Sequence, residues 1–180
     1  MGQEHDLTEQ NERWQPGAGI WHNVLYSGMY LAAIVAANLL TAWLGPWVTP
    51  INAFLFIGLD ITARDSLHDA WHGRGLWWKM ALLIGAGSAL SWALNRNAGP
   101  IALASFVAFA ASSTVDGLVY GALLKRDRMQ RVNGSNLAGA AVDSLVFPVL
   151  AFGWPPDPWI VYGQFTAKTA GGLFWSLVLK

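Results

Sequence analysis

Six polar or charged side chains lie deep inside long apolar segments of this chain. They comprise three aspartates, one lysine and two carboxamides: Asp60, Asp116, Asp143, Lys168, Gln164 and Asn38. A charged side chain at the centre of a bilayer costs at least ~2.5–3.5 kcal/mol, so those that persist usually face a partner or a cavity. Their types therefore predict a buried polar site inside an apolar bundle.

The spacing of these residues places them in stripes. Residues four apart in a helix lie on the same face, so Gln164 and Lys168 point the same way, and Asp116 shares a face with Tyr120. A further stripe precedes Gln164 in the chain and consists of Ser135, Asp143 and Phe147, with Asn136 beside it. Three carboxylates and one lysine are thus expected to converge on the interior.

Two of these aspartates leave two interpretations open. Asp143 and Lys168 either contact a bound molecule or form an ion pair that ties two helices together. Asp116 either forms a second wall of the same site or pairs with Arg126 or Arg128 near the end of its helix.

The composition of the chain indicates which kind of element must hold these polar residues. Of 180 residues, 54% are hydrophobic and only 12% are charged, half the share usual for a soluble domain. Eleven tryptophans and nineteen glycines are typical of membrane interfaces and membrane helices. The absence of cysteine excludes disulfides, thiolate nucleophiles and cysteine-ligated zinc or iron–sulfur sites. We expect no cofactor, no metal site and no catalytic residue, and we interpret His68 and His72 as interfacial.

The apolar segments predict an all-α integral membrane bundle of six transmembrane helices over residues 21–180, preceded by an acidic cytoplasmic tail over residues 1–20. Each span needs roughly 20 apolar residues. A soluble helical protein with an apolar core is disfavoured, because charge-free runs of this length exceed what soluble helices tolerate. The expected spans cover residues 24–47, 52 to about 62 with an amphipathic continuation, 76–94, 101–124, 135–152 and 159–179.

Positive charge predicts the orientation, because cytoplasmic loops carry the excess of Lys and Arg. With both ends inside, the cytoplasmic stretches include the KRDRMQR cluster that starts at Lys125, whereas the three opposite loops hold only Arg96. We interpret this cluster as an orientation signal and a contact for lipid headgroups, and we expect no nucleic-acid partner.

The fifth segment, RVNGSNLAGAAVDSLVF, resembles a signature of the queuosine-precursor transporter family, also called vitamin-uptake-like transporters. The pattern is R-x3-S-x7-D-S-x2-F, carried here by Arg131, Ser135, Asp143, Ser144 and Phe147. The resemblance extends over residues 31–180 through FLFIGLDITARDSLHDAW, ANLLTAWLG and GQFTAKTAGGLFW.

The second segment departs from this family in one position. Family members usually carry a glutamate four residues after the aspartate that corresponds to Asp60, and this chain has Arg64 there. Either Asp65 takes over the role of that acid or this branch recognises its ligand differently.

The resemblance implies a fold similar to the substrate-binding subunits of energy-coupling-factor vitamin importers, and transport of 7-deazaguanine bases such as preQ0 or preQ1 across the bacterial inner membrane. One carboxylate can accept from the base's N1–H and amine together, and Asp143 is the first candidate. An aromatic face, from Phe147, Tyr120 or Trp175, suits the flat ring. The expected substrate-binding residues are Asp143, Asp60, Asp116, Asn136, Ser135, Gln164, Lys168, Phe147 and Asn38.

Other classes of function are weighed against this one. A substrate-binding subunit for another small vitamin would have the same fold, and a structural membrane protein would use its aspartates only to pair helices. An intramembrane aspartyl protease is disfavoured because the Gly-x-Gly-Asp and Pro-Ala-Leu motifs are missing. The chain has no Walker-A loop and is not expected to be an enzyme. Whether an ATPase module couples to it is left open.

Overall fold

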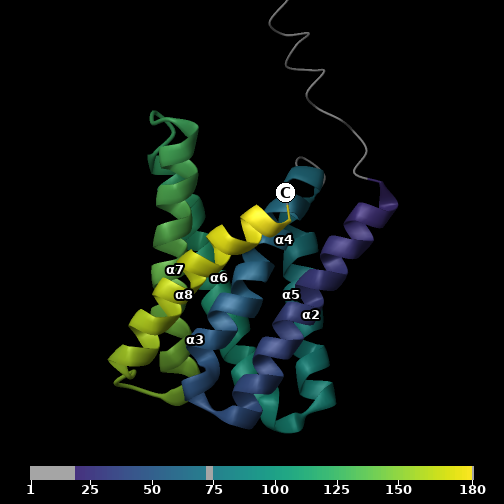
Figure 1. Cartoon of the computed structure of the whole chain (residues 1–180), viewed down its shortest axis with the longest axis vertical. Helices are drawn as coiled ribbons and strands as arrows, with labels where there is room; N and C mark the ends of the chain where they lie inside the picture. Colours follow the sequence, from purple (N-terminus) through teal and green to yellow (C-terminus); the bar gives the residue numbers. More distant parts are fainter. Residues whose placement is uncertain (1–18, 72–74, 180) are drawn as a thin grey trace, which may run out of the picture.

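The computed structural model describes residues 19–71 and 75–179 of the chain. Nearly all of the expected acidic tail, residues 1–20, lies outside this part, and so do His72 and the side chains of His68 and Asp65. The described residues are almost entirely helical, and they contain no strand (Figure 1). The all-α class predicted from the sequence is therefore confirmed.

The helices form six long segments joined by short turns. The second segment is built from three consecutive pieces, because a π-helical stretch, η2, interrupts its α-helical hydrogen bonding just before Asp60. Such π-bulges are frequent at functional sites. In chain order the elements are α2 (Ile20–Leu44), η1 (Pro46–Val48), α3 (Thr49–Asn52), η2 (Ala53–Ile57), α4 (Gly58–Trp71), α5 (Leu76–Leu94), η3 (Arg96–Ala98), α6 (Gly99–Ala122), α7 (Arg128–Phe152) and α8 (Pro158–Val178).

One predicted boundary differs clearly from the structure. The fifth span is expected to begin near Ser135, but α7 begins at Arg128, almost two turns earlier. The polar sequence RVNG continues the helix because it docks on the end of α6. The guanidinium of Arg131 lies 4.9 Å from the ring centroid of Tyr120, and its Nη1 donates to the Leu124 carbonyl at 3.4 Å.

The distribution of apolar and polar side chains between the outside and the interior of the bundle is that of a membrane protein. Large apolar side chains such as Leu82 and Leu103 are exposed on its outside, whereas Gln164 and Lys168 are buried. By length and composition, four described stretches can cross a membrane: Ile20–Leu44, Pro46–Arg64, Arg96–Ala122 and Asn133–Phe152. A fifth, Trp78–Leu94, is apolar but shorter. The chain is therefore a multi-pass membrane protein.

The six segments close into a ring. Helix α2 packs on α4 and α5, α5 on α6, α6 on α7, α7 on α8, and α8 returns to α4. Figure 1 shows the start of α2, the end of α4, the start of α5, the α6–α7 connection and the end of α8 at one end of the bundle. The α2–α3, α5–α6 and α7–α8 connections lie at the opposite end. An even number of segments thus returns both ends of the described chain to the same side.

Glycines allow α8 to lie directly against the π-helical stretch. A Cβ atom on Gly58 would lie 2.5 Å from the carbonyl carbon of Gly171, and a Cβ on Gly171 would collide with the carbonyl oxygen of Phe54. Small residues are the usual means by which membrane helices approach closely. This contact holds the polar face of α8 toward the centre of the ring.

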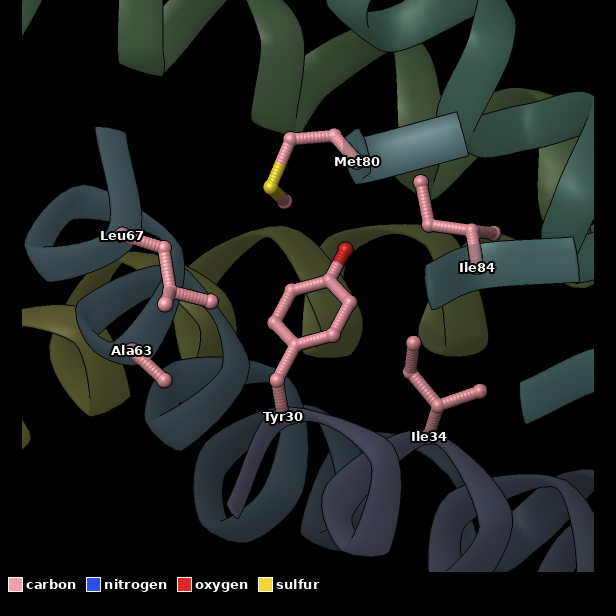
Figure 2. Close-up of a cluster of buried hydrophobic side chains, with 6 residues drawn as sticks. All are labelled: Tyr30, Ile34, Ala63, Leu67, Met80 and Ile84. Carbon is pink, nitrogen blue, oxygen red and sulfur yellow. The ribbon is translucent and has the colours of Figure 1, made fainter. Parts of the chain in front are cut away.

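A buried apolar cluster lies toward one end of the interior. Figure 2 shows the ring of Tyr30 rising from α2, with Ala63 and Leu67 of α4 on one side and Ile34 on the other, and its hydroxyl pointing toward the α5 side chains. The cluster lies near the α4–α5 connection and consists of Tyr30, Ile34, Ala63, Leu67, Met80 and Ile84.

Candidate functional site

A cavity of about 120 Å³ lies at the centre of the ring and has walls from all six segments. One ordered water needs only ~10–15 Å³ on the same measure, so the space suits a small molecule. Eight of the nine residues predicted for the site line this cavity. They are Asn38, Asp60, Asp116, Asn136, Asp143, Phe147, Gln164 and Lys168. Ser135 is also buried, but outside this wall.

Lys168 is the centre of a polar network between α7 and α8. Its Nζ is ion-paired with the Asp143 carboxylate, and it also donates to Ser144 Oγ at 3.2 Å and to Gln164 Oε1 at 3.1 Å. An ammonium group has three donors, so these partners use all of them. The lysine side chain is 4% exposed and that of Asp143 is 23% exposed. The network therefore fixes Asp143 in place while leaving part of its carboxylate open.

Gln164 is oriented by the same network. Because the ammonium group of Lys168 can only donate, the side-chain oxygen of Gln164 must face it. The amide nitrogen Nε2 is then left on the other side, where it is buried and has no hydrogen-bond partner among the described residues. Gln164 is thus set as a hydrogen-bond donor in the cavity wall.

The Asn38 carboxamide, unlike that of Gln164, is hydrogen-bonded to described residues through both its nitrogen and its oxygen. Its Nδ2 donates to Ser91 Oγ at 3.2 Å, and its Oδ1 accepts from Ser105 Oγ at 2.8 Å. These bonds link α2 to α5 and α6 across the bundle. Asn38 therefore holds three helices together at the edge of the cavity.

Asp116 and Asp143 line the same cavity from neighbouring helices. Ser112 Oγ, one turn before Asp116, donates to the Gly139 carbonyl at 2.9 Å. A Cβ atom on Gly139 would lie 3.4 Å from the Asp116 Cβ. Asp143 follows one turn after Gly139 on α7. Of the two interpretations of Asp116, its place in the wall is the one that the geometry provides.

No described ion pair joins Asp116 to either of its alternative partners. Arg126 is exposed in the α6–α7 connection, and the side chain of Arg128 falls outside the described part. The Asp116 Oδ1 atom is buried and has no hydrogen-bond partner in residues 19–71 and 75–179.

Several buried polar side chains of the wall are missing from the sequence-based set: Tyr30, Thr41, Thr49, Asn52 and Ser112. Asn52 donates through Nδ2 to the Ala37 carbonyl at 3.1 Å and to Thr41 Oγ1 at 3.0 Å, so its Oδ1 faces away as an acceptor. Tyr30 lies two turns before Asn38 on one stripe of α2, and extending that stripe would have found it. Asn52 stands at the edge of an apolar run, and sequence position alone suggests an exposed helix end.

The aromatic wall also differs from expectation. Phe147 lines the cavity as predicted, and Phe109 of α6 joins it. Tyr120 is instead covered by Arg131, and neither it nor Trp175 is part of the described cavity wall. Arg64, which stands where the resemblance places an acid, lines the cavity with its guanidinium 5.9 Å from the Phe109 ring centroid.

The fold and the cavity together define a class: a multi-pass helical membrane protein with a polar, small-molecule-sized chamber inside its ring. The sequence profile of a family described as "Putative vitamin uptake transporter" matches residues 22–179, nearly the whole chain. The chain belongs to this vitamin uptake transporter family. Searches of curated proteins and of solved structures found no match.

Proposed function

We propose that this protein imports a 7-deazaguanine precursor of queuosine, preQ0 or preQ1, across the bacterial inner membrane, with both termini in the cytoplasm. Family membership supports uptake of a vitamin-like molecule. The resemblance of the fifth segment supports this particular substrate. The excess of Lys and Arg at the end of the bundle where α2 begins and α8 ends supports the orientation.

The observation that carries the substrate proposal is the fixed carboxylate of Asp143. Lys168 holds one of its oxygens, and a carboxylate has further lone pairs for other donors. The adjacent N1–H and exocyclic amine of a deazaguanine form such a pair of donors. The Gln164 amide nitrogen has no hydrogen-bond partner among the described residues and can only donate, so it would bond the O6 atom of the same base.

The ring of the base would lie against an aromatic face. Phe147 and Phe109 come from neighbouring helices and both border the cavity. Stacking of a base on an aromatic side chain contributes ~1–3 kcal/mol. A flat ligand between two polar edges accounts for a wall that combines carboxylates, a carboxamide and phenyl rings.

Feeding experiments test this function directly. The gene is expressed in cells that cannot make preQ0 but can insert it into tRNA, and queuosine in the tRNA is measured after feeding preQ0 or preQ1. We expect queuosine to appear only when the protein is present. Asp143→Asn should abolish it, whereas Asp127→Asn, an exposed Asp-to-Asn change in the α6–α7 connection, should not.

Two results would overturn parts of the proposal. If wild-type protein reaches the membrane and no queuosine forms, the substrate is wrong, and another vitamin-like ligand takes its place. If Asp143→Asn transports normally while Asp143→Leu fails to fold, the Asp143–Lys168 pair serves structure alone.

A further inference from the structure

The charged side chains around the cavity do not balance. Five of the described residues in its wall have acidic or basic side chains: Asp60, Arg64, Asp116, Asp143 and Lys168. Asp143 is paired with Lys168. Asp60 and Arg64 lie one turn apart on α4, so that wall carries one charge of each sign. The remaining charge is the carboxylate of Asp116.

Two described cations on the neighbouring helices α7 and α8 interact with other groups. Lys168 is held by Asp143, Ser144 and Gln164. Arg131 lies over the Tyr120 ring and donates to the end of α6. Asp116 therefore makes no ion pair with a described side chain, although one of its oxygens is buried.

An unpaired carboxylate within a membrane protein is costly and usually marks a ligand or ion site. Asp116 also lies close to the carboxylate that we assign to the base. Asp143 stands four residues beyond Gly139, the residue against which Asp116 packs, and this corresponds to about 6 Å of helix rise. One bicyclic molecule could contact both carboxylates, one at each edge.

We propose that Asp116 binds a protonated amine on the transported molecule, so that the cavity prefers a cationic ligand to a neutral one of the same shape. This inference rests on the proposed function for the identity of the base. A primary alkyl amine titrates near pH 10, like that of lysine, and is positively charged at neutral pH. Among the two candidate bases, the aminomethyl compound preQ1 carries such a group, whereas the nitrile compound preQ0 is neutral.

Specificity of this kind is a difference between two affinities. The amine offsets the cost of the half-buried, unpaired Asp116 carboxylate, and the nitrile leaves that cost uncompensated. Hydrogen bonds between two charged groups are stronger than those between neutral groups, so we expect a preference of about tenfold or more for the cationic ligand.

The test measures binding of preQ1 and preQ0 to purified full-length protein in detergent, by thermal shift and by isothermal titration. Wild type should bind preQ1 about tenfold more tightly or better. Asp116→Asn should remove this preference by weakening preQ1 while leaving preQ0 little changed. Asp116→Glu, which keeps the charge, should retain part of the preference. Asp127→Asn is the matched control and should behave as wild type.

The outcomes separate this inference from the proposed function. Equal affinity of wild type for both compounds, absence of binding to either, or an equal loss of both in Asp116→Asn would overturn the role of Asp116. Queuosine formation from fed preQ0 without an amine preference would leave the transport function intact. An Asp116-dependent preference for preQ1 in binding, without any uptake in cells, would support the role of Asp116 and overturn the transport function.

Discussion

Asp116 and Asp143 face one cavity from two neighbouring helices, and among the described side chains only Asp143 has a cationic partner. Asp143 is held by Lys168, which is buried and uses its two other donors on Ser144 and Gln164. Asp116 lies on α6 and packs beside Gly139, which precedes Asp143 by one turn on α7. The two aspartates sit in similar sequences, VDGLVY and VDSLVF, yet the fold gives them different electrostatic surroundings.

Removing the lysine should destabilise the bundle more than removing both charges. Lys168→Met leaves the Asp143 carboxylate without its cation, and breaking one side of a buried pair costs about 3–5 kcal/mol. The double variant Lys168→Met, Asp143→Leu should recover much of this loss, because it leaves no uncompensated charge. Thermal and denaturant unfolding in detergent measure the free energy of unfolding in a double-mutant cycle.

Simple additivity of the two single changes would contradict the structural coupling of Lys168 and Asp143. Thr166→Met, an exposed change on the same helix, is the matched control and should have little effect.

Gln164→Glu should weaken ligand binding with little change in the fold. Glutamate retains an oxygen that accepts from Lys168, but it replaces the amide nitrogen with a second acceptor and so repels the O6 atom of a lactam base. We expect a loss of about tenfold or more in affinity, since an unmatched polar pair costs about 1–3 kcal/mol. Titration of purified protein with the base measures the change.

Ser144→Ala provides the comparison for Gln164. It removes another partner of Lys168 without changing a donor that faces the cavity. If both variants lose affinity equally, the effect of Gln164 passes through Lys168 and the direct bond to O6 is wrong.

Gly171→Ala should disturb the contact between α8 and the π-helical stretch. The added methyl group meets backbone atoms of Phe54, which cannot move aside as a side-chain tip can. Overpacking of this kind costs about 1–3 kcal/mol. The unfolding temperature and the size-exclusion profile should both report it.

Gly28→Ala serves as the control for Gly171, because a Cβ atom on Gly28 has no described atom within 4 Å. That variant should be as stable as wild type or slightly more stable, since alanine favours helix more than glycine does. Equal behaviour of the two variants would mean that α8 does not approach η2 so closely.

Cysteine labelling should reveal the orientation of the bundle, because the natural chain has no cysteine. Asn97→Cys and Arg126→Cys place single exposed thiols at opposite ends. If both termini lie in the cytoplasm, as we propose, an impermeant maleimide added to intact cells should label Asn97→Cys at once and Arg126→Cys only after permeabilisation. The reverse pattern would place the termini outside the cytoplasm.

The sequence of this protein is sufficient to predict its class, its six segments and most of the charged and carboxamide side chains in the wall of its cavity. Charge is so rare in the apolar runs that each buried Asp or Lys is conspicuous, and the cost of burying it requires an interior position. The four-residue spacing of Gln164 and Lys168 gives their common face. The resemblance in the fifth segment also indicates the family to which the whole chain belongs.

Only the tertiary structure decides which polar groups are used by one another and which are left for a ligand. Asn38 and Asp116 look alike as isolated polar residues in apolar helices. The first is bonded on both sides by serines from two other helices, whereas the second faces the cavity across Gly139. Asn52 and Phe109 likewise line the cavity only because of how the helices pack. Helix periodicity specifies the face of a residue, but the partner of that face depends on how distant segments pack, and this is a property of the whole ring.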